Sequence, residues 1–544
     1  MRKAREMLKT YQYPEFHYTR SPDQDAASPV HHPVLIVGGG MVGLTMALDL
    51  RLKGVPAIVL EQGETVSDGS RSICQAKRTL EIWDRQGAAA PMIEKGITWK
   101  IGRVRHGNRE LYSFDLLPEE GHKIPAFVNL QQYWVEEYLI DRLSEAGGEI
   151  RWRNKVISLT PTPEGVTLEV DTPEGPYAVT CDYLIAADGA RSQMRRELDL
   201  PFKGQVFNDK FLITDIEMQA DFPSERWFWF DPDFNPGQSA LLHRQADNVW
   251  RLDFQIGADA DNEEEMKREN VIPRVKAMLG EKTPFELEWI SVYTFQCRRL
   301  EKFRQGRVFF IGDAAHQVSP FGARGGNGGV QDADNLGWKL DLVMRGLAPG
   351  SLLDSYDEER VFAADENILN STRSTDFLTP KTPVSRAFRD AVLSLAEDCP
   401  FARPLVNSGR LSLPATLRGS SLNTPDEDVF AGAMEPGAPA ADAPVRHKGR
   451  QGWLLDHLGG GFTGVFFGDS GALPASLEME GLAIDVLAVG QNGLEDTKGW
   501  LANRYDGQPG TFYLIRPDQH IAGRWRHFDQ VKVHEAMRRA LGKI

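Results

Sequence analysis

Apolar and polar positions alternate most regularly in residues 33–61, where the pattern predicts a β-α-β unit. The short apolar run 33–37 indicates a buried strand, and residues 41–52 carry apolar side chains at helical spacing. A second apolar run, 57–60, ends in Glu61 and indicates the next strand. Strands joined by such a crossover helix lie parallel, so we expect an α/β domain built on a parallel sheet.

The pattern changes in residues 202–295, where aromatic-rich runs alternate with polar positions. Runs such as 227–230 and 249–255 are typical of antiparallel strands. A buried-strand pattern returns at 307–311, and helical spacing follows at 330–344. We therefore expect a second, antiparallel domain that interrupts the first one.

These changes of pattern define the expected domain organisation. A segment rich in Pro, Ser, Ala and Gly separates the first two domains from the end of the chain and is typical of a connector. The expected parts are an N-terminal extension (1–30), a discontinuous first domain (31–200 and 296–390), a second domain (201–295), a connector (391–445) and a third domain (446–544).

Composition and charge narrow the class of protein. Of the 544 residues, 41% are hydrophobic and 26% are charged, which is typical of a soluble globular protein. The net charge of -15 argues against a nucleic-acid partner, since such binding depends on clustered Lys and Arg. We expect no membrane span, because no run approaches the roughly 20 apolar residues that one requires, and the N-terminus lacks the apolar segment of a signal peptide.

Cysteine usage indicates the compartment and excludes some chemistry. The four cysteines, Cys74, Cys181, Cys297 and Cys399, lie far apart and form no CxxC pair. This spacing predicts neither a metal site nor a dithiol redox centre. We expect the protein to be cytoplasmic, where thiols stay reduced.

A glycine-rich turn stands between the first predicted strand and helix. Gly38, Gly40 and Gly43 fit the pattern GxGxxG, which lets the backbone turn sharply and approach a pyrophosphate at the helix N-terminus. Glu61 follows 18 residues after Gly43, where a carboxylate is placed to accept hydrogen bonds from ribose hydroxyls. The unit predicts dinucleotide binding but does not by itself distinguish FAD from NAD.

Two later segments repeat the pattern of a buried strand that ends in an acid and a glycine. The strand predicted at 183–187 leads into Asp188 and Gly189, and a second one leads into Gly312 and Asp313. Ligands of open α/β sheets bind at the carboxyl ends of the strands. We therefore expect both acids to lie beside the glycine-rich turn.

The three motifs, in this order, resemble those of the class A flavoprotein monooxygenases, the family of para-hydroxybenzoate hydroxylase and phenol hydroxylase. The resemblance spans most of the chain. It implies a Rossmann-like FAD-binding domain, an antiparallel-sheet substrate domain and a C-terminal thioredoxin-like α/β domain. It also implies that Glu61 binds the ribose of FAD, that Asp188 and Gly189 lie near FAD and the nicotinamide cofactor, and that Asp313 binds the ribityl chain.

The same resemblance implies further cofactor contacts. Arg71 resembles an arginine near the FAD diphosphate, and Gln132 a glutamine beside the ribityl chain; the alternatives are a surface arginine and a helix-face glutamine. Pro320 begins a glycine-rich loop that resembles the segment lying against the isoalloxazine ring. The backbone amides of Gly326 and Asn327, at the start of a helix, are placed to stabilise negative charge on reduced flavin.

The implied activity is hydroxylation of a small phenolic or related aromatic substrate through a flavin C4a-hydroperoxide, with consumption of O2 and of NADH or NADPH. Candidate residues of the substrate pocket are His243, Arg244, Arg251 and Pro320, although strand alternation places half of any strand outside the pocket. No catalytic residue is assigned. The third domain is interpreted as a packing or dimerisation module, so a homodimer is possible.

Three alternatives remain open at this point. The first keeps the fold but has a larger polyketide or fused aromatic as its substrate. The second is a non-catalytic FAD-binding protein. The third, a flavin disulfide reductase, requires a redox cysteine pair near the flavin, and the cysteine spacing argues against it.

Overall fold

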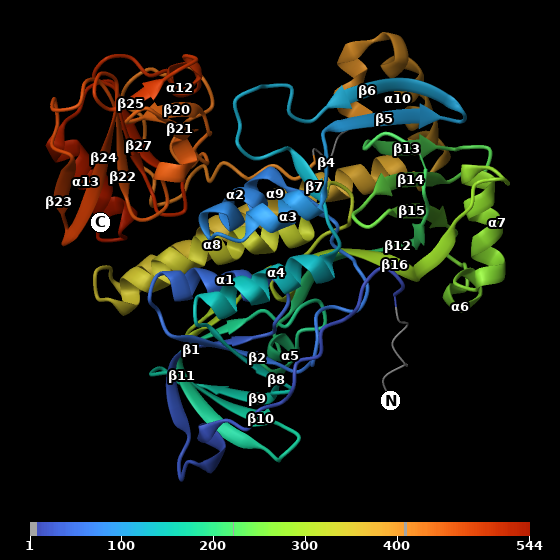
Figure 1. The fold of residues 1–544 in the computed structure, drawn as a ribbon, viewed down its shortest axis with the longest axis horizontal. Coiled ribbons are helices and arrows are strands. Elements are labelled where there is room, and N and C mark those ends of the chain that lie inside the picture. Colours follow the sequence, from blue (N-terminus) through green and yellow to red (C-terminus); the bar gives the residue numbers. More distant parts are fainter. Residues whose placement is uncertain (1–7, 221, 407–410) are drawn as a thin grey trace.

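The protein contains three large sheets, which belong to three regions of the molecule (Figure 1). The structure is a computed structural model and describes residues 8–220, 222–406 and 411–544. In Figure 1 the first sheet lies at the bottom, the second at the right and the third at the upper left. Within these ranges no helix combines the length and the apolarity that crossing a bilayer requires.

The first sheet contains the β-α-β unit predicted from the sequence. Strand β1 (Val30–Val37), helix α1 (Met41–Leu52) and strand β2 (Ala57–Glu61) follow one another, and α1 begins and ends at the predicted residues. β1 pairs in parallel with β2 and with β11 (Tyr177–Ala186), and β11 pairs in parallel with β18 (Val308–Phe310). The carboxyl ends of these strands therefore meet at one edge, which brings the three sequence motifs together.

Smaller elements complete the first domain. The sheet also contains β8 (Glu149–Trp152), β9 (Lys155–Pro161), β10 (Val166–Asp171) and β17 (Arg304–Gln305). A separate small sheet is formed by β3 (Cys74–Ala76), β4 (Ile97–Trp99) and β7 (Phe127–Asn129). The helices are α2 (Lys77–Arg85), α3 (Ala89–Lys95), α4 (Gln132–Glu145), α5 (Gln193–Glu197), α8 (Gly325–Met344) and α9 (Asp354–Leu378).

Helix α8 begins at Gly325, five residues before the helical spacing that starts at Val330, which agrees with the expectation that Gly326 and Asn327 open a helix. Sequence rules treat a run of glycines as a helix breaker. Here the glycines are required by close packing, because a Cβ on Gly329 would lie 2.6 Å from the Val42 side chain of α1. The glycine-rich run therefore forms the first turn of α8 instead of a loop before it.

The second sheet is antiparallel in its centre and belongs to the predicted substrate domain. Helices α6 (Asn262–Glu265) and α7 (Arg268–Leu279) belong to this domain, and Val271 and Val275 of α7 pack against residues of the sheet. The strands, in their order across the sheet, are β19 (His316–Gln317), β16 (Glu286–Leu300), β12 (Phe202–Glu217), β15 (Val249–Ile256), β14 (Ser239–Arg244), β13 (Arg226–Phe230), β5 (Ile101–His106) and β6 (Arg109–Asp115).

The predicted range 201–295 therefore lacks three strands of this sheet, namely β5, β6 and β19. β5 and β6 come from residues 101–115, and β5 pairs in parallel with β13. Parallel pairing between segments as distant as Gly102 and Arg226 leaves no trace in local periodicity, which is why the sequence pattern did not reveal it.

The first part of the predicted connector is helical, whereas its described residues 411–443 form no helix or strand. Helix α10 (Pro383–Asp398) crosses the expected boundary at residue 390, and α11 (Arg403–Val406) follows it. The side chain of Thr382 caps α10 and Pro383 occupies its first turn, where proline is favourable because its missing N–H has no intrahelical partner. Val392, Leu393 and Ala396 of α10 are buried in a hydrophobic cluster that includes residues of the second sheet.

The third sheet lies in the C-terminal region. β22 pairs in parallel with β24 and antiparallel with β26, and the chain ends in a helix. The thioredoxin-like assignment of this region stays a prediction. Its elements are β20 (Pro444–His447), β21 (Arg450–Trp453), β22 (Thr463–Phe467), β23 (Ser476–Met479), β24 (Leu482–Val489), β25 (Leu494–Asp496), α12 (Trp500–Tyr505), β26 (Phe512–Ile515), β27 (Ile521–Trp525) and α13 (Gln530–Ala540).

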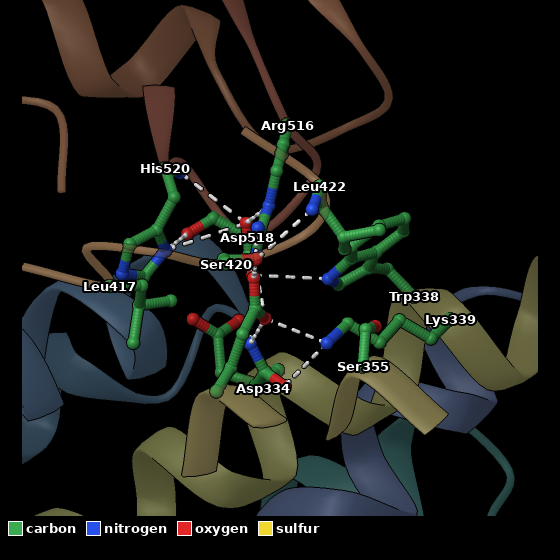
Figure 2. A network of polar contacts seen from close by, with 12 residues as sticks. Asp334, Trp338, Lys339, Ser355, Leu417, Ser420, Leu422, Arg516, Asp518 and His520 are labelled. Carbon is green, nitrogen blue, oxygen red and sulfur yellow. Dashed lines mark hydrogen bonds and ion pairs between the residues drawn. The ribbon is translucent and has the colours of Figure 1, made fainter. Parts of the chain in front are cut away.

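A buried ionic network joins the third region to helices α8 and α9 (Figure 2). Arg516 donates hydrogen bonds to the carboxylates of Glu359 and Asp518, and all three side chains are fully buried. Lys339 of α8 donates to Glu359 at 2.7 Å, and Trp338 Nε1 donates to Asp518 at 3.1 Å. The far half of α8 is therefore fixed to the C-terminal region.

Candidate active site

A cavity of about 730 Å³ extends from the glycine-rich turn to the face of the second sheet. Its walls come from the first two domains. On the first-domain side it is lined by residues of all three sequence motifs, namely Gly38, Gly40, Glu61, Asp188, Gly189 and Asp313. On the opposite side the lining includes Phe211, Leu241, Tyr293, Phe295 and Phe321.

The glycine-rich turn has no room for larger residues. Gly38 has a φ of +110°, and a Cβ there would lie 2.5 Å from the carbonyl oxygen of Ala187. A Cβ on Gly43 would collide with the carbonyl oxygen of Gly38. Gly40 precedes α1 without a side-chain cap, so the first amides of α1 remain available to an anion at this end of the cavity.

Glu61 lies at the end of β2 beside this turn. Its carboxylate accepts hydrogen bonds from the amides of Gly39 and Gly63, each at 2.6 Å. These bonds fix the orientation of the carboxylate, and each oxygen keeps capacity to accept a further bond. The position suits an acceptor for ribose hydroxyls.

Gln132 begins helix α4 and holds the loop that carries Arg71. Its side-chain amide donates to Glu136 at 2.9 Å and to Ser67 at 3.1 Å, and accepts from the amide of Ser72 at 3.3 Å. Arg71 is exposed, lines the cavity and makes no hydrogen bond or ion pair to any residue that the structure describes. Both residues thus line the cavity, and their contacts to the cofactor stay predictions.

Two carboxylates at the strand ends face the same cavity. The Asp313 side chain accepts no hydrogen bond from the described part of the chain, and burial raises its pKa. Asp188 Oδ2 accepts from the amide of Met194 at 3.0 Å, whereas its buried Oδ1 has no hydrogen-bond partner in the described ranges. Leaving a desolvated carboxylate oxygen without a donor is costly, so Asp313 and the Oδ1 atom of Asp188 suit a ligand that is rich in hydroxyl groups.

His316 is part of a buried network that holds the Asp313 turn in place. Its Nε2 lies 2.6 Å from Asp332 Oδ2, which also accepts from the amide of Gly312 at 3.0 Å. Arg360 donates to the other oxygen of Asp332 at 2.7 Å. Burial favours protonation of Asp332, but the charges of His316 and Arg360 outweigh it and lower the Asp332 pKa. His316 therefore has a structural role in this network.

The loop from Pro320 to the start of α8 closes one side of the cavity. Pro320, Gly326 and Asn327 all line it. The Asn327 side chain accepts from the amide of Ala76 at 2.9 Å and donates to the carbonyl of Cys74 at 2.9 Å. These bonds fix the first turn of α8 to β3. Gly326 and Asn327 in this turn therefore lie at the cavity with backbone amides that have no partner within the helix.

Strand alternation decides which candidates of the second sheet reach the cavity. His243 and Arg251 line it, whereas Arg244 does not. Arg244 points to the opposite face of β14, where its guanidinium lies 5.6 Å from the centre of the Trp250 ring. The interpretation of Arg244 as a pocket residue is therefore corrected by the alternation of side chains along its strand.

The guanidinium of Arg251 is already engaged. It donates two hydrogen bonds to the carboxylate of Asp215, each at 2.8 Å, and a further one to the carbonyl of Ser70 at 2.5 Å. Such a bidentate pair holds both side chains rigidly. Arg251 thus ties the second sheet to the loop that carries Arg71.

Sequence reasoning missed several polar lining residues, among them Arg226, Asp253 and Tyr293 of the second sheet. Asp253 lies two residues from Arg251 and therefore shares its face of β15, so alternation counted from Arg251 would have found it. Arg226 and Tyr293 lie on strands whose pairing partners the sequence did not reveal.

Comparison with known proteins agrees with this geometry. A family model described as an FAD binding domain matches residues 31–371, more than half of the chain. The 12-dehydrotetracycline 5-monooxygenase/anhydrotetracycline 6-monooxygenase of Streptomyces rimosus is 31% identical over 387 residues, covering 67% of this chain and 73% of that protein. The chain belongs to the FAD-dependent aromatic monooxygenases. This chain is also 29% identical over 382 residues to the 3-(3-hydroxy-phenyl)propionate/3-hydroxycinnamic acid hydroxylase of Mycolicibacterium smegmatis. The match covers 70% of this chain and 67% of that protein.

A solved structure of another protein supports the fold of this chain. The flavin-dependent monooxygenase PieE, in complex with FAD and substrate, superposes with a TM-score of 0.81 at 23% sequence identity. The superposition covers 95% of this chain and all of the other. It confirms the α/β class and the Rossmann-like FAD-binding domain.

The cavity residues of the monooxygenase fit FAD. The uncapped α1 N-terminus suits a pyrophosphate, and the carboxylates of Glu61 and Asp313 suit hydroxyl groups. When bound, FAD supplies electron transfer and O2 activation, with NADH or NADPH as the reductant. The chain itself binds the cofactor, orients the substrate and excludes water.

Electrostatics differ sharply among the polar residues of the substrate side. Burial, together with Arg226 and Arg251, holds the pKa of His243 well below its usual range, so its imidazole is neutral at pH 7. Burial raises the pKa of Asp253 to about 6 and that of Tyr293 to about 12. Near neutral pH the monooxygenase therefore presents a neutral imidazole, a phenol and a readily titrated carboxyl group.

The titration of Asp253 is expected to appear in the stability of the monooxygenase. Its pKa rises from 3.8 to about 6 on folding, so protonated Asp253 stabilises the fold below pH 3.8, and this contribution is lost as the pH rises through about 6. Asp253→Asn removes this titration. As the pH rises from acidic to neutral, we expect the free energy of unfolding of the variant to increase by about 2 to 3 kcal/mol relative to that of the wild type. Calorimetric melting temperatures over a pH series test this, and a pH-independent difference between variant and wild type would contradict it.

Proposed function

We propose that the substrate ring of this aromatic monooxygenase binds in the part of the cavity that faces the second sheet. One observation carries the proposal: a single cavity joins the FAD motifs to a wall of aromatic side chains. In that wall Phe211, Phe295 and Phe321 lie with ring centroids 5.2 to 5.3 Å apart, and Tyr293 lies 5.5 Å from Phe295. A protein that only bound FAD would have no need of this second, aromatic part.

We assign the cofactor contacts as follows. The amides after Gly38, Gly40 and Gly43, together with Arg71, hold the diphosphate, and Glu61 holds the ribose. Gln132 and Asp313 contact the ribityl chain, Asp188 and Gly189 lie between FAD and the nicotinamide cofactor, and Pro320, Gly326 and Asn327 lie against the isoalloxazine ring. The support for these roles is that every one of these residues except Gly43 lines the same cavity.

For the substrate we propose a small phenol or related aromatic. The support is the similarity to a hydroxylase of 3-(3-hydroxy-phenyl)propionate. A polyketide or fused aromatic is the second candidate, since another relative is named for tetracycline precursors. Stimulation of NADH and NADPH oxidation by matched panels of simple phenols and polycyclic phenols, with product identification, tests the two against each other. Stimulation confined to the polycyclic panel would exclude the small phenol.

We further propose the cytoplasm as the compartment, because all four cysteines are free thiols. Cys74 is the one cysteine among the described lining residues, and burial raises its pKa to about 11, which suits a structural residue. This agrees with the exclusion of a disulfide reductase. The homodimer stays a prediction, and light scattering of the purified protein tests it.

A further inference from the structure

Residues 8–16, which we call the N-terminal strap, precede the first sheet and pack against the first domain. Tyr11 of the strap is buried in the main hydrophobic core. Its ring stacks on that of Tyr133 in α4, with centroids 4.0 Å apart, and its hydroxyl donates to Glu137 at 2.6 Å. A stacked and hydrogen-bonded tyrosine of this kind holds its backbone firmly. The strap is therefore fixed on the surface of the FAD-binding domain.

The ends of the strap are fixed to different domains. Near its start, Thr10 donates two hydrogen bonds to Glu288 of β16, from its amide at 2.8 Å and from its hydroxyl at 2.7 Å. At its end, Phe16 stacks on Trp152 of β8 with centroids 4.1 Å apart. The Phe16 amide also donates to the carbonyl of Glu64 at 2.7 Å. The strap thus joins the second sheet to the first domain and contacts the loop between β2 and β3.

Tyr13, in the middle of the strap, contacts the same loop at Gly69. The Tyr13 hydroxyl accepts a hydrogen bond from the Gly69 amide at 3.0 Å. Gly69 is buried and has a φ of +69°, and a Cβ there would lie 2.5 Å from the Trp289 ring of β16. A buried amide that loses its acceptor is costly. The Tyr13 hydroxyl therefore helps to hold the loop in this conformation.

The loop carries Arg71 two residues after Gly69. Arg71 lines the cavity, and its side chain makes no hydrogen bond or ion pair to any residue that the structure describes. Its placement therefore depends on the backbone beside it. The Ser70 carbonyl accepts from Arg251 at 2.5 Å, and Tyr13 fixes the next residue back along the chain.

We propose that the strap retains FAD, with Tyr13 as a positioning residue that holds Gly69 and thereby keeps the Arg71 guanidinium at the cofactor. A loop that leaves its place must be brought back when FAD binds, and this lowers the apparent affinity. Loss of the Tyr13 hydrogen bond therefore weakens FAD binding although Tyr13 does not touch the cofactor. The inference rests on the proposed function, which assigns Arg71 to the FAD diphosphate.

The first test is Tyr13→Phe in the full-length protein, which removes the hydroxyl and keeps the ring. Titration of the FAD-free protein gives the dissociation constant of FAD, and the rise in flavin fluorescence on release gives the dissociation rate. We expect the dissociation constant to increase about 2- to 10-fold, with faster release. Tyr18→Phe is the matched control, because the Tyr18 hydroxyl donates to Gln24 at 2.7 Å, away from the loop. It should bind FAD as the wild type does.

A double-mutant cycle separates positioning of Arg71 from a general loss of stability. Arg71→Met alone is expected to weaken FAD binding about 10-fold. Adding Tyr13→Phe to Arg71→Met should weaken it further by less than about 2-fold, because no guanidinium is left to position. A purely structural role of Tyr13 would give the same loss with and without Arg71.

The outcomes distinguish this inference from the proposed function. Unchanged FAD binding in Tyr13→Phe, or an equal effect of that substitution in both Arg71 backgrounds, overturns the inference. Normal FAD binding by Arg71→Met overturns the inference together with the assignment of Arg71. The proposed aromatic hydroxylation is overturned by a different result, namely wild-type NADH and NADPH oxidation that no aromatic compound stimulates.

Discussion

Asp313→Ala is expected to lose most of its FAD during purification. The Asp313 carboxylate lies in the cavity and receives no hydrogen bond from the described part of the chain, so its acceptor capacity is available to cofactor hydroxyls. Hydrogen bonds to a charged group contribute about 1.5 to 3 kcal/mol each. One lost bond corresponds to FAD binding weakened about 10- to 100-fold, and two lost bonds to more. The ratio of flavin to protein absorbance and the dissociation constant of reconstituted protein measure the effect.

Two control variants accompany this substitution. Cys297→Ser changes a buried thiol of β16 that does not line the cavity, and we expect it to retain FAD and most of its activity. Asp313→Asn keeps the shape of the side chain but removes its charge. Its FAD content should lie between that of Asp313→Ala and that of the wild type. Normal FAD content in Asp313→Ala, or a greater loss in Cys297→Ser, would show that the assignment of Asp313 is wrong.

Arg516→Met is expected to destabilise the protein more than any substitution of a surface charge. Arg516 is fully buried between the carboxylates of Glu359 and Asp518, and the substitution leaves both without their main counter-charge (Figure 2). Removing one partner of a buried ion pair costs about 3 to 5 kcal/mol. Thermal unfolding followed by circular dichroism measures the loss.

The matched control for this prediction is Arg446→Met in the same C-terminal region. Arg446 pairs with Glu495 on the surface, with side chains 40% and 58% exposed. Such pairs contribute about 0 to 1 kcal/mol. Similar melting temperatures for Arg516→Met and the wild type would mean that the network of Figure 2 does not hold the C-terminal region to α8 and α9.

Local patterns in the sequence predicted the cofactor side of the molecule well. Helix α1 has its predicted limits, and Glu61, Asp188 and Asp313 all reach the edge where parallel strands end. These features depend on short-range rules, namely helical periodicity, glycine geometry and the position of strand ends. Each is visible within about 30 residues of sequence.

The substrate side was predicted less completely, because its geometry depends on contacts between distant segments. The parallel pairing of β5 with β13 has no local signal. Without that register, Arg226 was not recognised. The neighbours His243 and Arg244 were both kept as pocket candidates, although alternation along β14 brings only His243 to the cavity. The helical spacing that begins at Val330 also missed the first turn of α8, which starts at Gly325.

The central claim is that this chain hydroxylates an aromatic ring with FAD, a nicotinamide cofactor and O2. The most direct measurement incubates the purified yellow protein with NADH or NADPH and the phenol and polycyclic panels under isotopically labelled O2. We expect at least one aromatic compound to stimulate cofactor oxidation and to gain one labelled oxygen atom. A protein that cannot be loaded with FAD, or a product that carries no labelled oxygen, would contradict the claim.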